Sequence, residues 1–124
     1  MTVHHEPRVV QKPWGHEEIF ADTPNYVGKI LFIREGEALS LQYHEIKEET
    51  LRVLDGSLDL LLGRDADALE THHLKSGAVF HVSPGTLHRM TATSDCRLLE
   101  VSTNHLDDVV RLEDRYGRKG TNAP

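Results

Sequence analysis

Residues 36–56 read GEALSLQYHEIKEETLRVLDG, and the fold prediction starts from the pattern in this stretch. Alternate residues of a β-strand face the same side, so a strand over Ser40–His44 points Gln42 and His44 to one face. Glu49 then opens a second apolar run after a short loop. Asp55-Gly56 ends that run with a dipeptide typical of a tight hairpin turn, which predicts that the chain returns antiparallel. Gln42, His44 and Glu49 can therefore meet at one point.

A second segment, Gly77 to His88, supplies a fourth polar side chain. Ser83-Pro84-Gly85 predicts a tight turn, and His88 opens the apolar strand that follows it. Two imidazoles, one carboxylate and one amide oxygen suit one divalent metal ion, with zinc first and iron, manganese, cobalt or nickel as alternatives. The sequence therefore predicts a metal site whose ligands are Gln42, His44, Glu49 and His88.

Short apolar segments separated by turn residues run through the chain and predict an all-β sandwich or barrel. The expected strands are Glu17–Ala21, Tyr26–Arg34, Ser40–His44, Thr50–Leu54, Ser57–Leu62, Glu70–Leu74, Ala78–Val82, His88–Thr93 and Arg97–Ser102. A loose arm is expected over residues 1–12, the barrel over 13–103 and a C-terminal segment over 104–124. In that last segment, the spacing of Val110 and of the charged residues between Asp107 and Gly117 predicts a short helix or turn.

Composition narrows the class of protein. The chain has 124 residues, which fits one domain over 1–124. Its net charge of −6 and scattered basic residues argue against binding to nucleic acid. No apolar run approaches the length of a membrane span, and residues 1–11 lack the apolar core of a signal peptide. Cys96 is the single cysteine and is expected to be a structural thiol. We therefore expect a cytoplasmic protein that does not enter a membrane.

The two polar segments together resemble the two motifs of the cupin superfamily, G-x5-H-x-H-x3,4-E-x6-G and G-x5-P-x-G-x2-H-x3-N. Gln42 stands at the first histidine position of those motifs, Ser83 at the proline position and Ala92 at the final asparagine position. The resemblance implies a small single-domain cupin, which is a jelly-roll barrel also called a double-stranded β-helix. It also implies metal ligation by Gln42, His44, Glu49 and His88.

Gln42 and four matching stretches narrow the resemblance to the cupin domain of type II phosphomannose isomerases. The stretches are Lys12-Pro13-Trp14-Gly15, Ser40-Leu41-Gln42-Tyr43-His44, Pro84-Gly85-Thr86-Leu87-His88-Arg89 and Asp107-Asp108-Val109-Val110-Arg111-Leu112-Glu113-Asp114-Arg115-Tyr116-Gly117-Arg118. In larger relatives this domain follows a nucleotidyltransferase domain, and since this sequence shows none, we expect no sugar-nucleotide synthesis. The resemblance implies a sugar or sugar phosphate as the small-molecule partner, and a homodimer.

The sequence departs from that family directly after His44, where the family usually continues H-H-R-x-E-H-W. Lys47 replaces the arginine and keeps its charge without the bidentate fork for phosphate. Thr50 replaces a histidine and cannot transfer a proton at neutral pH, and Leu51 replaces a tryptophan.

Charged residues outside the ligand set are the candidates for substrate binding and catalysis. Lys29 interrupts an apolar strand, and alternation leaves open whether it faces solvent or meets an anionic ligand. Arg111 either binds a phosphate or carboxylate or pairs with a neighbouring aspartate, and the structural pair is favoured. The candidate catalytic residues are Lys47, Glu48 and Arg111, and the candidate substrate-binding residues are Lys29 and Arg111. His81 is expected to be packed or exposed and not to be a fifth ligand.

Three functions compete on these observations. The first is a metal-dependent isomerase of a sugar or sugar phosphate, or an epimerase-like relative, in which the metal polarises a carbonyl group, and Glu48 and metal-bound water are the candidate bases. The second is a non-haem iron dioxygenase, because His44, Glu49 and His88 alone make a two-histidine-one-carboxylate set, although Gln42 as a fourth ligand counts against it. The third is a non-catalytic sugar-binding module. The isomerase is the prediction.

Overall fold

Short strands follow one another along the chain because apolar residues alternate with polar ones between turns that contain glycine or proline. The computed structural model describes residues 3–121. Its strands are β1 (Arg8–Lys12), β2 (Gly15–Asp22), β3 (Val27–Ile33), β4 (Leu41–Tyr43), β5 (Glu49–Asp55), β6 (Ser57–Gly63), β7 (Glu70–Lys75), β8 (Val79–Val82), β9 (Leu87–Ala92), β10 (Cys96–Ser102), β11 (Val110–Glu113) and β12 (Gly120–Thr121). Each strand expected from the sequence is confirmed within two residues at either end.

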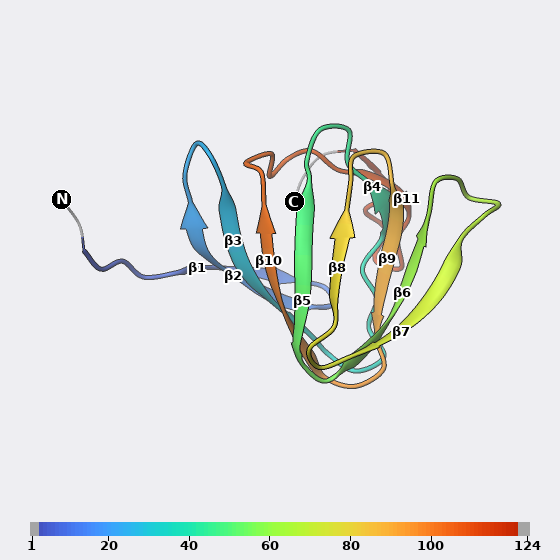
Figure 1. The fold of residues 1–124 in the computed structure, drawn as a ribbon, viewed down its shortest axis with the longest axis horizontal. Coiled ribbons are helices and arrows are strands. Elements are labelled where there is room, and N and C mark those ends of the chain that lie inside the picture. Colours follow the sequence, from blue (N-terminus) through green and yellow to red (C-terminus); the bar gives the residue numbers. More distant parts are fainter. Residues whose placement is uncertain (1–2, 122–124) are drawn as a thin grey trace.

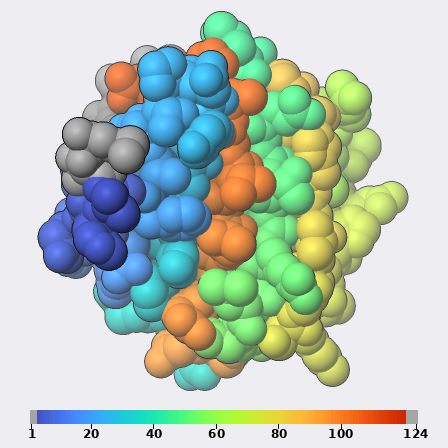
Figure 2. Space-filling model, turned by 60° about the vertical axis from the view of Figure 1, so that its left-hand side comes forward, coloured from blue at the N-terminus to red at the C-terminus, as the bar shows by residue number. Residues whose placement is uncertain are grey.

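The strands form two antiparallel sheets that face each other. The first sheet has the order β1-β2-β3-β10-β5-β8, and the second has the order β12-β11-β4-β9-β6-β7. Figure 1 shows the first sheet on one side of the molecule and β9, β6 and β7 on the other. Figure 2 shows the outer face of the first sheet, where bands of colour follow that same strand order. The predicted all-β jelly roll is confirmed, as a sandwich whose edges stay open instead of a closed barrel.

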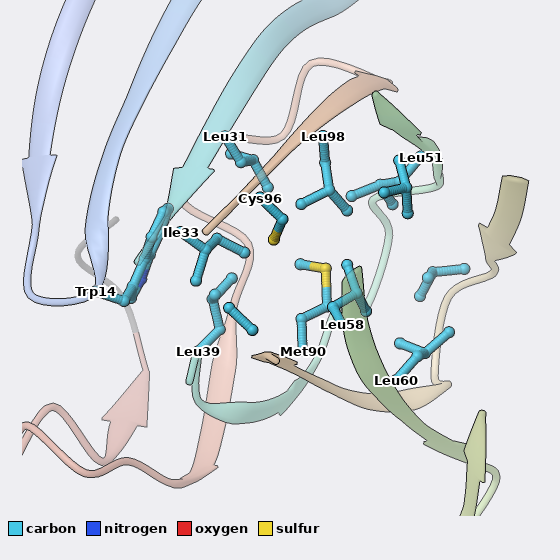
Figure 3. Close-up of a cluster of buried hydrophobic side chains, with 13 residues drawn as sticks. Trp14, Leu31, Ile33, Leu39, Leu51, Leu58, Leu60, Met90, Cys96 and Leu98 are labelled. Atoms are coloured by element: carbon cyan, nitrogen blue, oxygen red, sulfur yellow. The ribbon is translucent and has the colours of Figure 1, made fainter. Parts of the chain in front are cut away.

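The core lies between the sheets at one end of the sandwich. Leu51, Val53 and Leu98 of the first sheet are buried against Leu58 and Leu60 of the second. Figure 3 shows how these side chains converge with the others of the cluster, which are Trp14, Leu31, Ile33, Leu39, Val82, Met90, Ala92 and Cys96. Trp14 is therefore a packing residue.

The inner face of the first sheet changes from apolar to charged along its strands. In β10, Cys96 and Leu98 belong to the core, and the next inward residue is Glu100. In β5, Leu51 is inward and the strand begins at Glu49, which is also buried. Because the two strands are antiparallel and Glu49 lies opposite Ser102, their charged ends coincide. One end of the sandwich is thus apolar and the other holds buried charges.

The Asp55-Gly56 turn corrects the predicted hairpin. β5 pairs with β10 and β8, whereas β6 pairs with β9 and β7, so the turn carries the chain from one sheet to the other. Gly56 has a φ of 79°, in the region that favours glycine. A Cβ atom there would lie 2.2 Å from the carbonyl oxygen of Asp95. The dipeptide makes the tight turn as predicted, but the strands that it joins do not pair.

Two further predictions concern the ends of the chain, and the one for the N-terminal arm is wrong. The expected loose arm contains β1, which pairs with β2 over its whole length. Between Asp107 and Gly117, where a short helix or turn is expected, the described residues form turns before and after β11 and no helix, and β11 pairs with β4 and β12. Val109 and Arg111 are both buried, which is the period-two pattern of a strand. Pairing with β4 therefore overrides the helical spacing.

Two smaller expectations can be compared with the fold. Cys96 is buried in the core, and burial together with Asp55 and Asp95 raises the pKa of its thiol to about 11. This confirms a structural thiol. Within residues 3–121, no helix has the length and hydropathy needed to cross a membrane.

We predict that Gly56→Ala destabilises the protein far more than Gly85→Ala. Both glycines have similar positive φ, 79° and 81°, but a Cβ atom at Gly85 meets nothing within 4 Å. The shared backbone penalty is about 1–2 kcal/mol, and the overlap at Gly56 adds about 1–3 kcal/mol. Urea unfolding of the two variants measures the difference. Equal unfolding free energies would show that the turn at Gly56 yields to the extra methyl group.

Candidate metal centre

The two sheets contribute different residues to one buried cluster at the charged end of the sandwich. His44 follows β4 and His88 lies in β9, both in the second sheet, while Glu49 begins β5 in the first. The Nε2 atoms of His44 and His88 lie 3.6 Å and 3.4 Å from Oε1 of Glu49. All three side chains are buried, and their ligand atoms lie within 4.8 Å of one another. The structure therefore brings together three of the four predicted ligands.

Backbone carbonyl groups orient both imidazoles. Nδ1 of His44 lies 2.5 Å from the carbonyl oxygen of Asp108, and Nδ1 of His88 lies 3.0 Å from that of Thr86. A carbonyl oxygen only accepts hydrogen bonds, so each Nδ1 donates, and a neutral imidazole then presents a lone pair at Nε2. Among the described residues, neither buried Nε2 atom has a hydrogen-bond partner.

Three atoms with lone pairs, two imidazole nitrogens and one carboxylate oxygen, thus face one another in a buried space. A cation bound between them would remove their mutual repulsion. Two ligands about 2.1 Å from a tetrahedrally coordinated metal lie about 3.4 Å apart, close to the separations of both Nε2 atoms from Glu49. The residues therefore fit a divalent metal ion. Gln42 lies opposite His88 in the second sheet. It lines a cavity that His44 and Glu49 also line. Its Oε1 accepts a hydrogen bond of 3.0 Å from Ser40. Its role as the fourth ligand stays a prediction.

Lys47 neutralises the far side of the Glu49 carboxylate. Its Nζ lies 2.9 Å from Oε2 of Glu49 and 3.1 Å from Oε2 of Glu100. Burial alone would lower the pKa of Lys47, but the two carboxylates raise it above its usual value. Burial alone would raise the pKa of Glu49, but Lys47 and the two imidazoles hold it well below its usual range. Lys47 therefore stays protonated and leaves Oε1 of Glu49 for a metal.

A row of alternating charges continues from Lys47 across the inner face of the first sheet. Nζ of Lys29 lies 3.8 Å from Oε2 of Glu100 and 3.3 Å from Oε2 of Glu17, and Nζ of Lys12 lies 4.0 Å from Oε1 of Glu17. Every side chain of the row is at most a tenth exposed. We call these residues the ion-pair chain: Lys12, Glu17, Lys29, Glu100, Lys47 and Glu49. Lys29 thus faces inward, where two carboxylates are its partners.

Asp108 fixes the loop that carries His44 and Lys47. Its carboxylate accepts backbone hydrogen bonds from Glu45, Ile46 and Lys47 at 3.0, 2.7 and 2.8 Å. Burial would raise the pKa of Asp108, but these hydrogen bonds outweigh it and hold the pKa below its usual value. Since the carbonyl group of Asp108 also orients His44, one residue positions both the loop and the ligand.

The remaining predicted site residues have different surroundings. Glu48 directly precedes β5 and does not line the cavity, and its Oε2 lies 2.9 Å from Nε2 of His81. The structure thus places Glu48 beside His81 and not beside the predicted metal ligands, and His81 is half-exposed. Thr50 also faces outward, with Oγ1 2.9 Å from Nδ1 of His81. Arg111 is buried in the cavity wall, where the charge of Asp114 acts on it.

The cavity beside the cluster has a volume of about 70 Å³. Sequence reasoning missed five charged residues of its wall, although their alternation with buried apolar neighbours or their place in a matched stretch was a usable signal. They are Lys12, Glu17, Glu100, Asp108 and Arg118.

Comparison with known proteins identifies relatives over nearly the whole chain. The family model described as mannose-6-phosphate isomerase C-terminal matches residues 1–114. The mannose-1-phosphate guanylyltransferase ManC of Salmonella typhimurium is 33% identical over 122 residues, which cover 93% of this chain and 24% of ManC. The mannose-1-phosphate guanylyltransferase of Escherichia coli K12 is 33% identical over 124 residues, which cover 92% of this chain and 24% of that protein. The chain thus spans about a quarter of the length of these relatives.

Solved structures share the fold at low sequence identity. The capsular polysaccharide assembling protein CapF of Staphylococcus aureus superposes with a TM-score of 0.79 at 16% identity and covers 90% of this chain and 33% of its own. The oxalate decarboxylase of Lactobacillus farciminis, in a formate complex, has a TM-score of 0.72 at 18% identity and covers 86% and 33%. KdgF of Halomonas sp. has a TM-score of 0.68 at 21% identity and covers 80% and 87%. At these identities the likeness shows the fold alone.

We predict that the metal-free protein binds one Zn²⁺ ion per chain and becomes more stable. At a free concentration one hundred times the Kd, binding stabilises the folded state by about 2.7 kcal/mol. His88→Ala should abolish the shift in Tm, whereas His81→Ala, which changes a half-exposed histidine outside the cluster, should keep it. Elemental analysis after dialysis gives the stoichiometry. An equal shift in wild type and His88→Ala would place the metal elsewhere.

We also predict that Asp108→Ala destabilises the fold and weakens zinc binding. The loop loses the charged acceptor of three backbone N–H groups, which should cost about 2 kcal/mol because part of the loop regains hydrogen bonds to water. Asp107→Ala is the matched control, since Asp107 is exposed and its hydrogen bond within the described residues, from the N–H of Val109, is to its backbone carbonyl group, which alanine keeps. Thermal unfolding and zinc titration measure both effects. Indistinguishable variants would contradict the positioning role of Asp108.

Proposed function

The chain belongs to the mannose-6-phosphate isomerase C-terminal family and has the cupin fold, and on that premise we propose that it is a metal-dependent isomerase of a sugar or sugar phosphate. Two buried imidazole nitrogens without hydrogen-bond partners among the described residues face one carboxylate oxygen, and this arrangement supports a divalent metal in the cavity. Zinc is the first candidate for the ion, and iron, manganese, cobalt and nickel are alternatives.

Aldose–ketose isomerisation moves a proton between neighbouring carbons while negative charge develops on the carbonyl oxygen. A bound divalent ion supplies Lewis acidity at such an oxygen. The chain itself contributes the orientation of both imidazoles, through the carbonyl groups of Asp108 and Thr86. It also contributes the positive charge of Lys47, whose raised pKa keeps it protonated beside Glu49. Lys47 therefore serves as an electrostatic group and not as a base.

Proton transfer needs a carboxylate that faces the cavity and does not bind the metal. Glu17 and Glu100 meet both conditions. In the ion-pair chain, Lys47 is the one residue between Glu100 and the predicted ligand Glu49. Glu17 lies further from Glu49 along the same chain. We therefore assign proton transfer to Glu100. Lys29 acts as the counter-ion of both carboxylates, and Arg111 in the cavity wall remains the predicted contact to substrate.

A non-haem iron dioxygenase is the second candidate, and one observation favours it. The amide oxygen of Gln42 already accepts a hydrogen bond from Ser40, so His44, Glu49 and His88 could act without it as a two-histidine-one-carboxylate set. Oxygen consumption by the Fe²⁺-loaded protein, compared with the Zn²⁺-loaded protein, separates this function from isomerisation.

A homodimer also stays a prediction. Val79 of β8 and Val101 of β10 are 60% and 50% exposed on the outer face of the first sheet, the face that Figure 2 shows. Outward apolar residues of this kind suit contact with a second copy of the chain.

We predict that the metal-loaded protein interconverts mannose 6-phosphate and fructose 6-phosphate. Glu100→Gln should lower kcat by about a hundredfold or more while metal content is kept, because general acid–base catalysis contributes about 10²–10⁴-fold. Glu48→Gln, at an exposed carboxylate outside the cavity, should leave kcat unchanged. A coupled assay for fructose 6-phosphate measures the rates. Sugar-phosphate binding without turnover in the metal-loaded wild type would refute the isomerase and favour a non-catalytic binding module.

A further inference from the structure

We propose that Thr50, His81 and Glu48 form a second catalytic site, on the outer face of the first sheet, that hydrolyses small carboxylic esters. Thr50 is the nucleophile, His81 is the general base, and Glu48 is a positioning residue. The inference goes beyond the proposed function and needs no metal, because none of these residues lines the cavity of the candidate metal centre. It gives a role to Thr50, which stands where the phosphomannose isomerase pattern has a histidine and which the isomerase does not use.

Two hydrogen bonds join the three side chains through one imidazole ring. Oγ1 of Thr50 lies 2.9 Å from Nδ1 of His81, and Oε2 of Glu48 lies 2.9 Å from Nε2 of the same ring. An ionised carboxylate only accepts hydrogen bonds, so Nε2 carries a proton and donates to Glu48. In the neutral imidazole, Nδ1 then has a lone pair that accepts the hydrogen bond from the hydroxyl group of Thr50. This arrangement activates a hydroxyl group as a nucleophile.

The backbone fixes where the three side chains lie. Thr50 of β5 and His81 of β8 are directly opposite each other in antiparallel strands, so their side chains share one face of the sheet, the face that Figure 2 shows. Glu48 precedes Thr50 by two residues. The N–H group of Glu48 donates to Oγ1 of Thr103 at 3.2 Å, and its carbonyl group accepts from the N–H group of Thr103 at 3.0 Å. Strand pairing and these two hydrogen bonds therefore position all three residues.

A hollow of about 310 Å³ adjoins Thr50, His81 and Glu48 and provides room for a substrate. Val101 also lines it, lies opposite Thr50 on β10 and is half-exposed. An apolar side chain beside the nucleophile suits a short acyl group. Asn25 lines the hollow as well, and its side-chain amide has N–H donors for the negative charge that develops on the carbonyl oxygen of an ester.

The reaction consumes only the ester and water. Oγ1 of Thr50 bonds to the carbonyl carbon while its proton passes to Nδ1 of His81. The bond to the leaving alkoxide breaks, and the alkoxide takes that proton and departs as the alcohol. Water then attacks the acyl-threonine ester and gives a proton to Nδ1, which returns it to Oγ1 as the carboxylic acid is released. Glu48 stabilises the imidazolium in both steps without touching the substrate.

Two other histidines show what distinguishes His81. Nδ1 of His73 contacts the carboxylate of Asp59, and Nδ1 of His105 contacts the hydroxyl group of Thr103. Each has one of the two partners. Among the imidazoles of residues 3–121, only His81 contacts a hydroxyl group with one ring nitrogen and a carboxylate with the other. Acyl transfer needs both contacts, because the base must accept a proton on one side and be oriented from the other.

The test measures hydrolysis of p-nitrophenyl acetate by the full chain after dialysis against a chelator. Thr50→Val removes the hydroxyl group and should lower kcat by about a hundredfold or more, because its proton transfer to the base is lost. Thr50→Ser keeps a hydroxyl group and should retain activity. Thr71→Val is the matched control, since Thr71 is exposed on β7, and its kcat should equal that of wild type.

Glu48→Gln tests the positioning residue. It should lower kcat about tenfold with KM unchanged, because the imidazolium loses a charge-assisted hydrogen bond and the substrate loses no contact. Mass spectrometry after an acid quench should find an acetyl group on the peptide that contains Thr50. An acetyl group on His81 instead would overturn the proposal, because the imidazole would then be the nucleophile.

Two further outcomes would overturn the second site. One is a wild-type rate no higher than that of buffer, and the other is an equal kcat in wild type and in the folded Thr50→Val variant. His88→Ala, which alters the candidate metal centre, should keep the esterase activity. Failure of zinc binding or of isomerisation therefore refutes the proposed function separately, whereas failure of ester hydrolysis refutes the site at Thr50.

Discussion

The rest of the site depends on the buried row of alternating charges on the inner face of the first sheet. Removing a charge from water costs several kcal/mol per ion, so each member needs a counter-charge within reach. The ion-pair chain provides one at every step, at separations from 2.9 to 4.0 Å. It runs from β1 through β2, β3 and β10 to Lys47, in the loop before β5, and to Glu49, the first residue of β5. A shift of register by one residue would turn these charges outward and expose the apolar residues that alternate with them. The sheet register and the position of Glu49 are therefore set together.

The candidate metal centre lies where the two sheets come together at their charged end. Glu49 comes from the first sheet and both histidines from the second, so a bound ion would join the sheets at the end that lacks an apolar core. The histidines owe their orientation to backbone carbonyl groups, and Asp108 links one of them to the loop that carries Lys47. The same loop thus positions a ligand and the counter-ion of another ligand. Asp108 therefore contributes to the site through its backbone carbonyl group and through the loop that it holds, although the Asp108 carboxylate contacts no predicted ligand side chain.

Sequence alone predicts the strands and the ligands for a common reason, which is that both depend on local spacing. Residues two apart in a strand share a face, and turn residues mark where strands end. Asp55-Gly56 shows the limit of that reasoning, because a dipeptide determines the turn but not whether the two strands pair in one sheet. Glu17 and Glu100 show another limit. A charged residue in a short strand is usually solvated, and the burial of these two carboxylates depends on their partners, Lys29 on β3 and Lys47 in the loop before β5. Those partners are far apart in the sequence.

The departures from the phosphomannose isomerase pattern fall at positions with very different surroundings. Thr50 faces outward and contacts His81, so a histidine at this position in β5 would also point away from the cavity. Leu51 is in the core, so leucine in place of tryptophan at this position affects core packing and not the cavity. Lys47 alone lies in the cavity wall, and its compact ammonium group reaches one oxygen of Glu49 and one of Glu100. An ammonium group suits this position between two carboxylates, because both contacts are single and neither needs a fork. The substitution at Lys47 therefore preserves the charge pattern of the candidate metal centre.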